Sequence, residues 1–167
     1  MRLFLIALTV VITFASVAPA QQKSLAFEGE KHLKNIKQLT FGGENAEAYF
    51  SFDGKRLIFQ SKRDNLACDQ IFTMNIDGSN VKMVSNGEGR TTCSYFMKGN
   101  KKILYASTHG GKKECPPNPD FSKGYVWPVY PDYDVYTSTV DGKNITKLTN
   151  TPGYDATTAR MRATVSA

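Results

Sequence analysis

The chain is poor in the residues that build catalytic and metal centres. It has two histidines, three cysteines and no CxxC pair, and neither histidine stands at ligand spacing, so a zinc site has little support. It also lacks GxSxG, the nucleophile turn of the α/β-hydrolases, and His109 has no Ser or Cys nucleophile motif around it. The sequence therefore favours a protein that is not an enzyme and needs no cofactor.

A basic stripe is also missing, although the formal net charge is +6. Lys and Arg are scattered among Asp and Glu, and Lys112-Lys113 is a notable cluster late in the chain. Proteins that bind nucleic acid usually gather their basic residues on one face. We therefore expect a solvated surface and no nucleic-acid partner, and an anionic envelope surface fits this charge better.

Long apolar runs are confined to the amino terminus. Met1-Arg2 is followed by the apolar run Leu3–Val17 and by Ala18-Pro19-Ala20, a small-x-small cleavage site. This order is typical of a signal peptide (1–20), and the run is too short to span a bilayer comfortably. The alternative is a transmembrane anchor that stays attached. We predict a periplasmic or secreted protein with no integral membrane segment after cleavage, and an amino-terminal linker at 21–34.

All three cysteines, Cys68, Cys93 and Cys115, follow the predicted signal peptide. In an oxidising compartment two of them can form a disulfide. The sequence leaves open which two.

An internal repeat dominates the rest of the chain. Residues 45–61 (NAEAYFSFDGKRLIFQS) align without a gap onto residues 91–107 (TTCSYFMKGNKKILYAS) at an offset of 46. Each copy has two short apolar runs around a turn signal, Asp53-Gly54 or Gly99-Asn100. This pattern predicts a β-hairpin with a two-residue turn that needs positive φ.

A second pair of segments repeats in the same way. DQIFTMNIDGSNVKMVS (69–85) aligns onto YDVYTSTVDGKNITKLT (133–149) at an offset of 64, again around Asp-Gly. Two hairpins make four strands per unit. The rise of the offset from 46 to 64 places about 18 extra residues between the hairpins of the second unit, within an insertion at 109–132.

Four antiparallel strands that recur about every 46 residues match a blade of a β-propeller. We predict an all-β fold with one blade at 41–85 and another at 87–149, in which the first and third strands are parallel. Residues 35–40 resemble residues 144–149 and are predicted to form a leading strand, the last strand of a preceding or closing blade. An irregular β-sandwich is the alternative.

The predicted blades do not complete a ring, because propellers close with about four to eight blades. Residues 151–156 resemble the beginning of another blade, and 157–167 would be its truncated start. We interpret the sequence as an incomplete propeller and a fragment. The alternative is a short chain that completes its ring by self-association through its open blade edges.

The motifs SFDGKRLIFQSKRDN and DQIFTMNIDGSNVKMVS resemble the repeats of TolB-like propellers, also called WD40-like repeats. Their pattern is of the type SPDGKRLxFxSxRDGxxxIYxMNxDGxxxxxLT. The resemblance covers residues 35–156 and implies a propeller that binds protein partners in the periplasm. Phe52 replaces the usual Pro, residues 96–100 depart further, and 21–34 has no room for the domain that precedes the propeller in TolB.

Similar blades also cover the catalytic domain of exported serine peptidases of the dipeptidyl peptidase and tricorn type. The alternative function is therefore the amino-terminal propeller part of a larger exported hydrolase. Our first hypothesis is a non-enzymatic module that binds a protein or peptide in the cell envelope.

The candidate binding surface is the end of the blades where the first and third strands begin, because loops on a rigid scaffold often carry binding. The expected rim residues are Arg63, Asp64, Thr91, His109, Tyr125, Trp127 and Tyr130. The aromatics of the insertion either form a recognition surface or pack the long loop onto the blade. Loops around 64–69 and 132–134 carry carboxylates that suit Ca²⁺, although turn and capping roles explain Asp equally well.

Overall fold

The computed structural model describes residues 25–156, which form two units, 25–37 and 38–156. The predicted signal peptide at 1–20 and the predicted blade start at 157–167 lie outside the described residues. In the first unit the Glu30 carboxylate accepts the backbone N–H groups of His32 and Leu33, at 2.6 and 3.0 Å. Among the described residues, no helix is long and apolar enough to cross a membrane.

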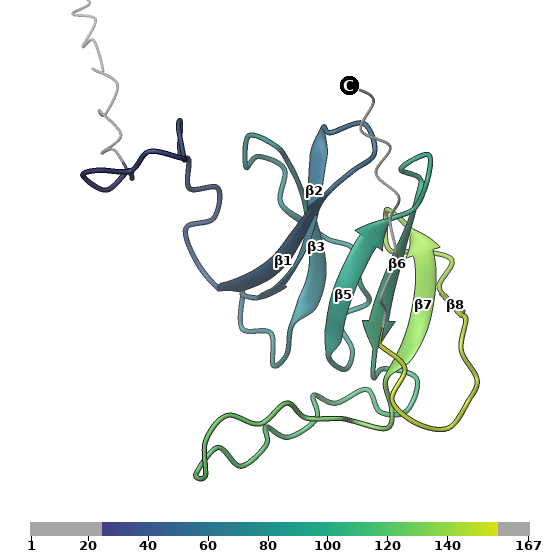
Figure 1. Ribbon diagram of the computed structural model, residues 1–167. Helices are drawn as coiled ribbons and strands as arrows, with labels where there is room; N and C mark the ends of the chain where they lie inside the picture. The colour runs from purple at the N-terminus through teal and green to yellow at the C-terminus, as the bar shows by residue number, and fades with distance from the viewer. Residues whose placement is uncertain (1–24, 157–167) are drawn as a thin grey trace, which may run out of the picture. The chain divides into compact units, whose positions relative to one another are not determined.

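The second unit is all β and consists of two four-stranded antiparallel sheets (Figure 1). The first sheet contains β1 (Glu44–Phe50), β2 (Arg56–Lys62), β3 (Gln70–Asn75) and β4 (Lys82–Met83). The second contains β5 (Thr91–Phe96), β6 (Lys102–Ser107), β7 (Asp134–Thr139) and β8 (Thr146–Lys147). Each sheet is a meander of four consecutive strands, so its first and third strands are parallel. This is the predicted arrangement of propeller blades.

The two sheets share one register. The pair Arg56↔Asn75 in β2 and β3 becomes Lys102↔Thr139 in β6 and β7, at the offsets found in the sequence. The first hairpin of each sheet, β1–β2 or β5–β6, also contains a bulge. The register shifts between Ala46 and Tyr49 in β1 and between Thr92 and Tyr95 in β5. The sequence repeat is therefore a repeat of backbone geometry.

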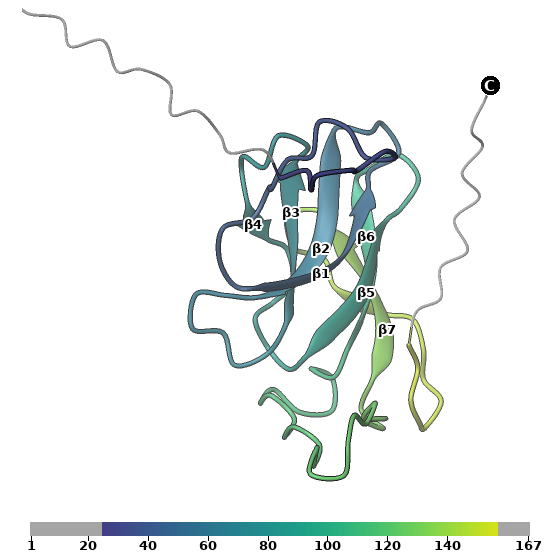
Figure 2. The same cartoon turned by 60° about the vertical axis from the view of Figure 1, so that its left-hand side comes forward.

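The bulges fall at equivalent residues. Glu47 in β1 and Cys93 in β5, which are 46 positions apart, both have a φ of 51°. A left-handed residue in a bulge increases the local twist of the strand. Tyr49 and Tyr95 follow the bulges, and their ring centroids lie 4.6 Å apart where β1 and β5 run side by side (Figure 2).

The hairpin turns are longer than the two residues predicted. In the first turn the Ser51 N–H donates to the Arg56 carbonyl at 2.9 Å, which leaves residues 52–55 in the loop. The Asp53 carboxylate stabilises this longer loop, because it accepts the Ser51 hydroxyl at 2.6 Å and the Lys55 N–H at 3.2 Å. Gly54 has the expected positive φ, 65°.

The main core lies between the sheets. Ile58 and Ile71 of the first sheet, with Val84 directly after β4, pack against Phe96, Ile103, Tyr105 and Tyr136 of the second. Residues on the other face of the first sheet form a second cluster, Leu57, Phe59, Phe72 and Met74, joined by Leu39 and Leu66. Successive residues of a strand point to opposite faces, so both faces of β2 are covered.

Residues 35–40, predicted as a leading strand, form no strand. Leu39 nevertheless packs on the first sheet as Val84 packs on the second. A Cβ at Gly78 would lie 3.1 Å from the Leu39 carbonyl oxygen, and a Cβ at Gly142 would lie 3.1 Å from that of Val84. The repeat thus includes the contact between Leu39 and Gly78, although residues 35–40 do not pair with a neighbouring strand.

Polar contacts hold the two sheets together. Asn100 accepts the Phe52 N–H through Oδ1 at 2.8 Å and the Arg56 guanidinium through its carbonyl at 2.9 Å. Near the other end of the sheets, Gln60 Oε1 accepts the Thr92 hydroxyl at 2.8 Å. Hydrogen bonds therefore join the two sheets near both of their ends, and the loops at each end project from sheets that are fixed to one another.

Candidate functional site

The insertion lies between β6 and β7 and contains neither helix nor strand. It projects from the end of the second sheet where β5 and β7 begin (Figure 1). We call this end of the unit the rim; it also carries the loop 63–69 that joins β2 to β3.

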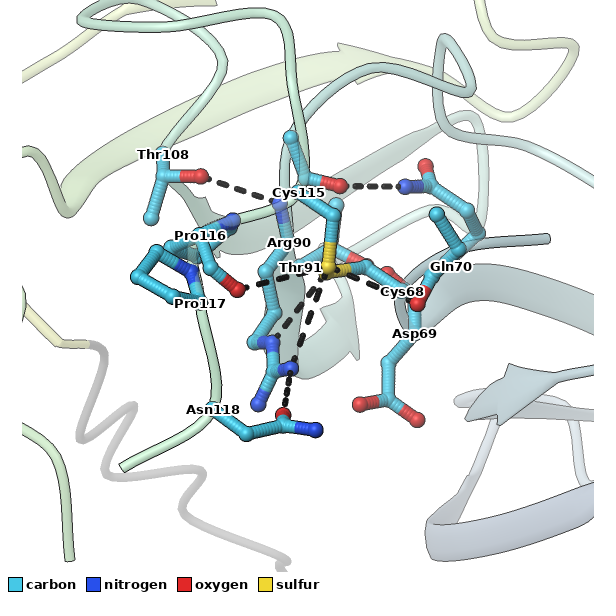
Figure 3. The surroundings of a disulfide bond; sticks show 12 residues. Cys68, Asp69, Gln70, Arg90, Thr91, Thr108, Cys115, Pro116, Pro117 and Asn118 are labelled. Carbon is cyan, nitrogen blue, oxygen red and sulfur yellow. Dashed lines mark hydrogen bonds between the residues drawn. A yellow bond between two sulfur atoms is a disulfide. The ribbon is translucent and has the colours of Figure 1, made fainter. Parts of the chain in front are cut away.

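A disulfide joins these two loops (Figure 3). It links Cys68, at the end of the β2–β3 loop, to Cys115 in the insertion, with a Cα–Cα distance of 5.6 Å. Cys93 lies outside this bond, in the β5 bulge. The disulfide therefore fixes the insertion of one blade to the loop of its neighbour.

Arg90, which sequence reasoning missed, organises this junction. Its Nε donates to Cys68 Sγ at 3.3 Å, and its Nη2 donates to Asn118 Oδ1 at 3.0 Å (Figure 3). The guanidinium carbon lies 6.0 Å from the centroid of the Tyr130 ring. One side chain at the start of β5 thus contacts the disulfide and two parts of the insertion.

A cavity of about 200 Å³ opens beside this junction. Polar residues from the sheets line one part, and aromatic and proline residues, mostly from the insertion, line the rest. Its lining is Gln60, Asp69, Arg90, Thr91, Thr92, Asn118, Pro119, Phe121, Tyr125, Val126, Trp127, Pro128, Tyr130, Tyr133 and Tyr154. We call it the aromatic cavity.

The aromatic side chains in and directly after the insertion divide into two groups. Tyr133 is buried against Tyr154, with 5.4 Å between ring centroids, and the Tyr130 hydroxyl donates to the Pro117 carbonyl. Trp127 is 58% exposed and Tyr125 is 80% exposed. Some aromatics therefore pack the loop, as one reading of the sequence predicts, while others present an apolar surface to solvent.

Asp69 is the acidic residue of the cavity and is half-buried. Burial raises the pKa of its carboxyl group, and the nearby Arg90 charge offsets this only in part. No other described residue donates a hydrogen bond to this carboxylate or forms an ion pair with it. Figure 3 shows the carboxylate directed away from the disulfide.

Four of the predicted rim residues line the aromatic cavity: Thr91, Tyr125, Trp127 and Tyr130. Arg63 and Asp64 line a separate hollow next to Phe41 and Gly43. The Arg63 guanidinium lies 5.1 Å from the ring centroid of Phe72. The structure therefore does not bring the predicted rim residues into one site.

His109 lines neither hollow. Its ring centroid is 4.1 Å from that of Tyr136, and its Nδ1 lies 2.7 Å from the Ser107 hydroxyl. The Ser107 side chain is completely buried, so this Ser–His contact cannot reach a substrate. Burial lowers the pKa of His109, which favours the neutral imidazole in the folded chain.

Within residues 25–156, no group of three or more His, Cys, Asp or Glu side chains could hold a metal ion. The carboxylates of the loops around 64–69 and 132–134 do not form such a group. The carboxylate of Asp134, at the start of β7, instead forms an ion pair with Lys147 at 2.7 Å and accepts the Thr149 hydroxyl.

The meander sheets, their shared register and the common rim define a segment of a β-propeller with two adjacent blades. The structure of this chain is similar to the solved structure of a putative TolB from Agrobacterium tumefaciens, with a TM-score of 0.53 and 24% sequence identity. The match covers 71% of this chain and 38% of that protein. The fold is therefore TolB-like, and the chain matches well under half the length of that neighbour. No family model matches the sequence, and no curated protein matches it.

Proposed function

We propose that the chain is a non-enzymatic, exported TolB-like propeller segment that binds a protein or peptide through its rim. The observation that carries the proposal is the exposed aromatic surface of the insertion around Tyr125 and Trp127. Trp, Tyr and Arg are the residues that most often dominate binding energy at protein interfaces. All three border the aromatic cavity.

The rim supports binding because its shape is fixed before a ligand arrives. The disulfide at Cys115 and the Arg90 hydrogen bond to Asn118 restrain the first half of the insertion. A loop that is already ordered loses less conformational entropy when it binds. The aromatic cavity is also large enough to take one side chain of a partner.

Export to the periplasm or beyond is part of the proposal. The Cys68–Cys115 bond would persist in an oxidising compartment and would be rare in a reducing one. This agrees with the signal peptide predicted at 1–20. Such a location would supply envelope proteins and peptides as partners.

Panning a displayed random peptide library on the disulfide-bonded chain tests the proposal. We expect selected peptides to lose at least tenfold in affinity when Trp127→Ala or Tyr125→Ala removes an exposed ring, a loss of about 1.4 kcal/mol. Phe52→Ala is the matched control, because Phe52 is 50% exposed in the turn between β1 and β2, at the opposite end of the sheets. Failure to select any peptide, or equal binding by the Trp127 variant, would refute the proposal.

A further inference from the structure

We propose that Asp69 and the aromatic cavity recognise a positively charged group of the bound peptide, an ammonium or guanidinium ion. This inference rests on the proposed function and specifies the ligand chemistry of the same surface. It depends on three features: a half-buried carboxylate, its incomplete neutralisation by the protein, and the aromatic rings around it.

Asp69 lines the cavity, and no other described residue forms an ion pair or a hydrogen bond with its carboxylate. Lys147 and Lys113 form ion pairs with other acidic residues, and the described residues include no ion pair to Asp69. A half-buried carboxylate without a direct ion pair is unfavourable unless another group compensates its charge. A cationic ligand would provide that compensation.

Arg90 does not fill this role. Its hydrogen bonds go to Cys68, Asn118 and, at 3.9 Å, the sulfur of Cys115, so its guanidinium is committed to holding the insertion. The pKa of Asp69 is raised by burial, against the smaller opposing effects of the Arg90 and Lys62 charges. The Glu44 charge adds to the rise. Burial of the carboxylate therefore outweighs the positive charges near it, and neither of these forms a direct ion pair with it.

The rings of the cavity suit a cation as well. Trp127, Tyr130 and Tyr133 line the same hollow as Asp69. The face of an aromatic ring attracts a cation by about 0.5–2 kcal/mol, most strongly when the cation is partly desolvated. An alkyl chain with a terminal charge, as in Lys or Arg, can pack on the rings while its head group meets the carboxylate.

The chain carries its own reporter for this site, because Trp127 is its only tryptophan. The tryptophan fluorescence of the disulfide-bonded chain should change saturably on titration with the peptide Ac-Gly-Gly-Lys-Gly-Gly-NH₂. The same peptide with norleucine in place of lysine keeps the alkyl chain and removes the charge. We expect it to bind at least tenfold more weakly, and equal affinities would overturn the inference.

The matched variants are Asp69→Asn and Asp64→Asn, which make the same change at the two ends of one loop. Asp64 lines the separate hollow and does not border the aromatic cavity. We expect Asp69→Asn to weaken the lysine peptide at least tenfold and Asp64→Asn to leave its affinity unchanged. An unchanged affinity in Asp69→Asn would also overturn the inference.

The peptides selected from the library separate the two proposals. If they need Trp127, lack Lys and Arg, and bind Asp69→Asn as well as the unaltered chain, peptide binding stands and recognition of a cation falls. If no peptide binds at all, both proposals fail. Enrichment of basic residues that depends on Asp69 supports both.

Discussion

The half-buried His109 makes the stability of the folded chain depend on pH. Because burial lowers its pKa in the folded state, the unfolded chain binds more protons between that value and about 6.5. The free energy of unfolding should therefore fall as pH drops below about 6.5. Denaturant titrations at pH 7.5 and pH 5 should show a smaller difference for His109→Gln than for the unaltered chain.

His32 supplies the control for this measurement, since it is the only other histidine and its side chain is exposed. His32→Gln should retain the full pH dependence. An unchanged slope in His109→Gln would show that the Tyr136 and Ser107 contacts do not depend on a neutral ring.

Adding one methyl group at Gly142 tests how closely the two blades pack. A Cβ there would lie 3.1 Å from the Val84 carbonyl oxygen, and the backbone φ is 81°. Gly99 has a φ of 87°, but a Cβ there would meet nothing within 4 Å. Gly99→Ala should cost about 1 kcal/mol through the left-handed backbone alone.

Gly142→Ala should lower the free energy of unfolding by about 1 kcal/mol more than Gly99→Ala, because a neighbouring backbone must also shift. Urea unfolding of the two variants measures the difference. Equal losses would mean that the blades move apart at no cost.

Among the elements of the fold, the insertion depends most on a single bond. Cys68 and Cys115 are 47 positions apart, and a disulfide that closes a loop of this size stabilises the folded state by about 4 kcal/mol. Cys115→Ser should lower the unfolding free energy by an amount of this order and weaken peptide binding at the rim. Cys93→Ser should leave binding unchanged. Equal peptide binding by the two variants would show that binding at the rim does not depend on the disulfide.

The strands were predictable because their signal is local: alternating apolar residues between Asp-Gly or Gly-Asn turns. The length of the first turn was not, since it depends on the hydrogen bonds of Asp53. The roles of Asp69 and Arg90 were missed because each depends on a neighbour distant in sequence, such as Asn118 for Arg90. The sequence offered one signal for Arg90: it is a basic residue directly before β5, a strand that begins at the rim.

At the scale of the whole molecule, the repeat shows which apolar face the described residues 25–156 leave uncovered. Ile58, Ile71 and Val84 of the first blade are buried by the second blade. The equivalent residues of the second blade, at the same offsets, are Leu104, Val135 and Leu148. The first two are half-buried, and Leu148 is 49% exposed. Apolar surface of this kind favours association.

We therefore expect the purified chain to associate with itself as its concentration rises. Leu148→Lys should weaken that association, as measured by sedimentation, because it places a charge on the uncovered face. Phe52→Lys, at an equally exposed position away from this face, should not. A strictly monomeric sample with a sharp, cooperative melt would contradict the expectation.

The common register of β2–β3 and β6–β7 has a consequence for how such a protein can diversify. The pair Ser61↔Gln70 and its equivalent Ser107↔Asp134 close hairpins of very different loop length with the same geometry. A hairpin that accepts either loop places no constraint on what lies beyond its last pair. We therefore expect the insertion at 109–132 to tolerate changes of length, and new binding specificities could arise there without redesign of the sheet.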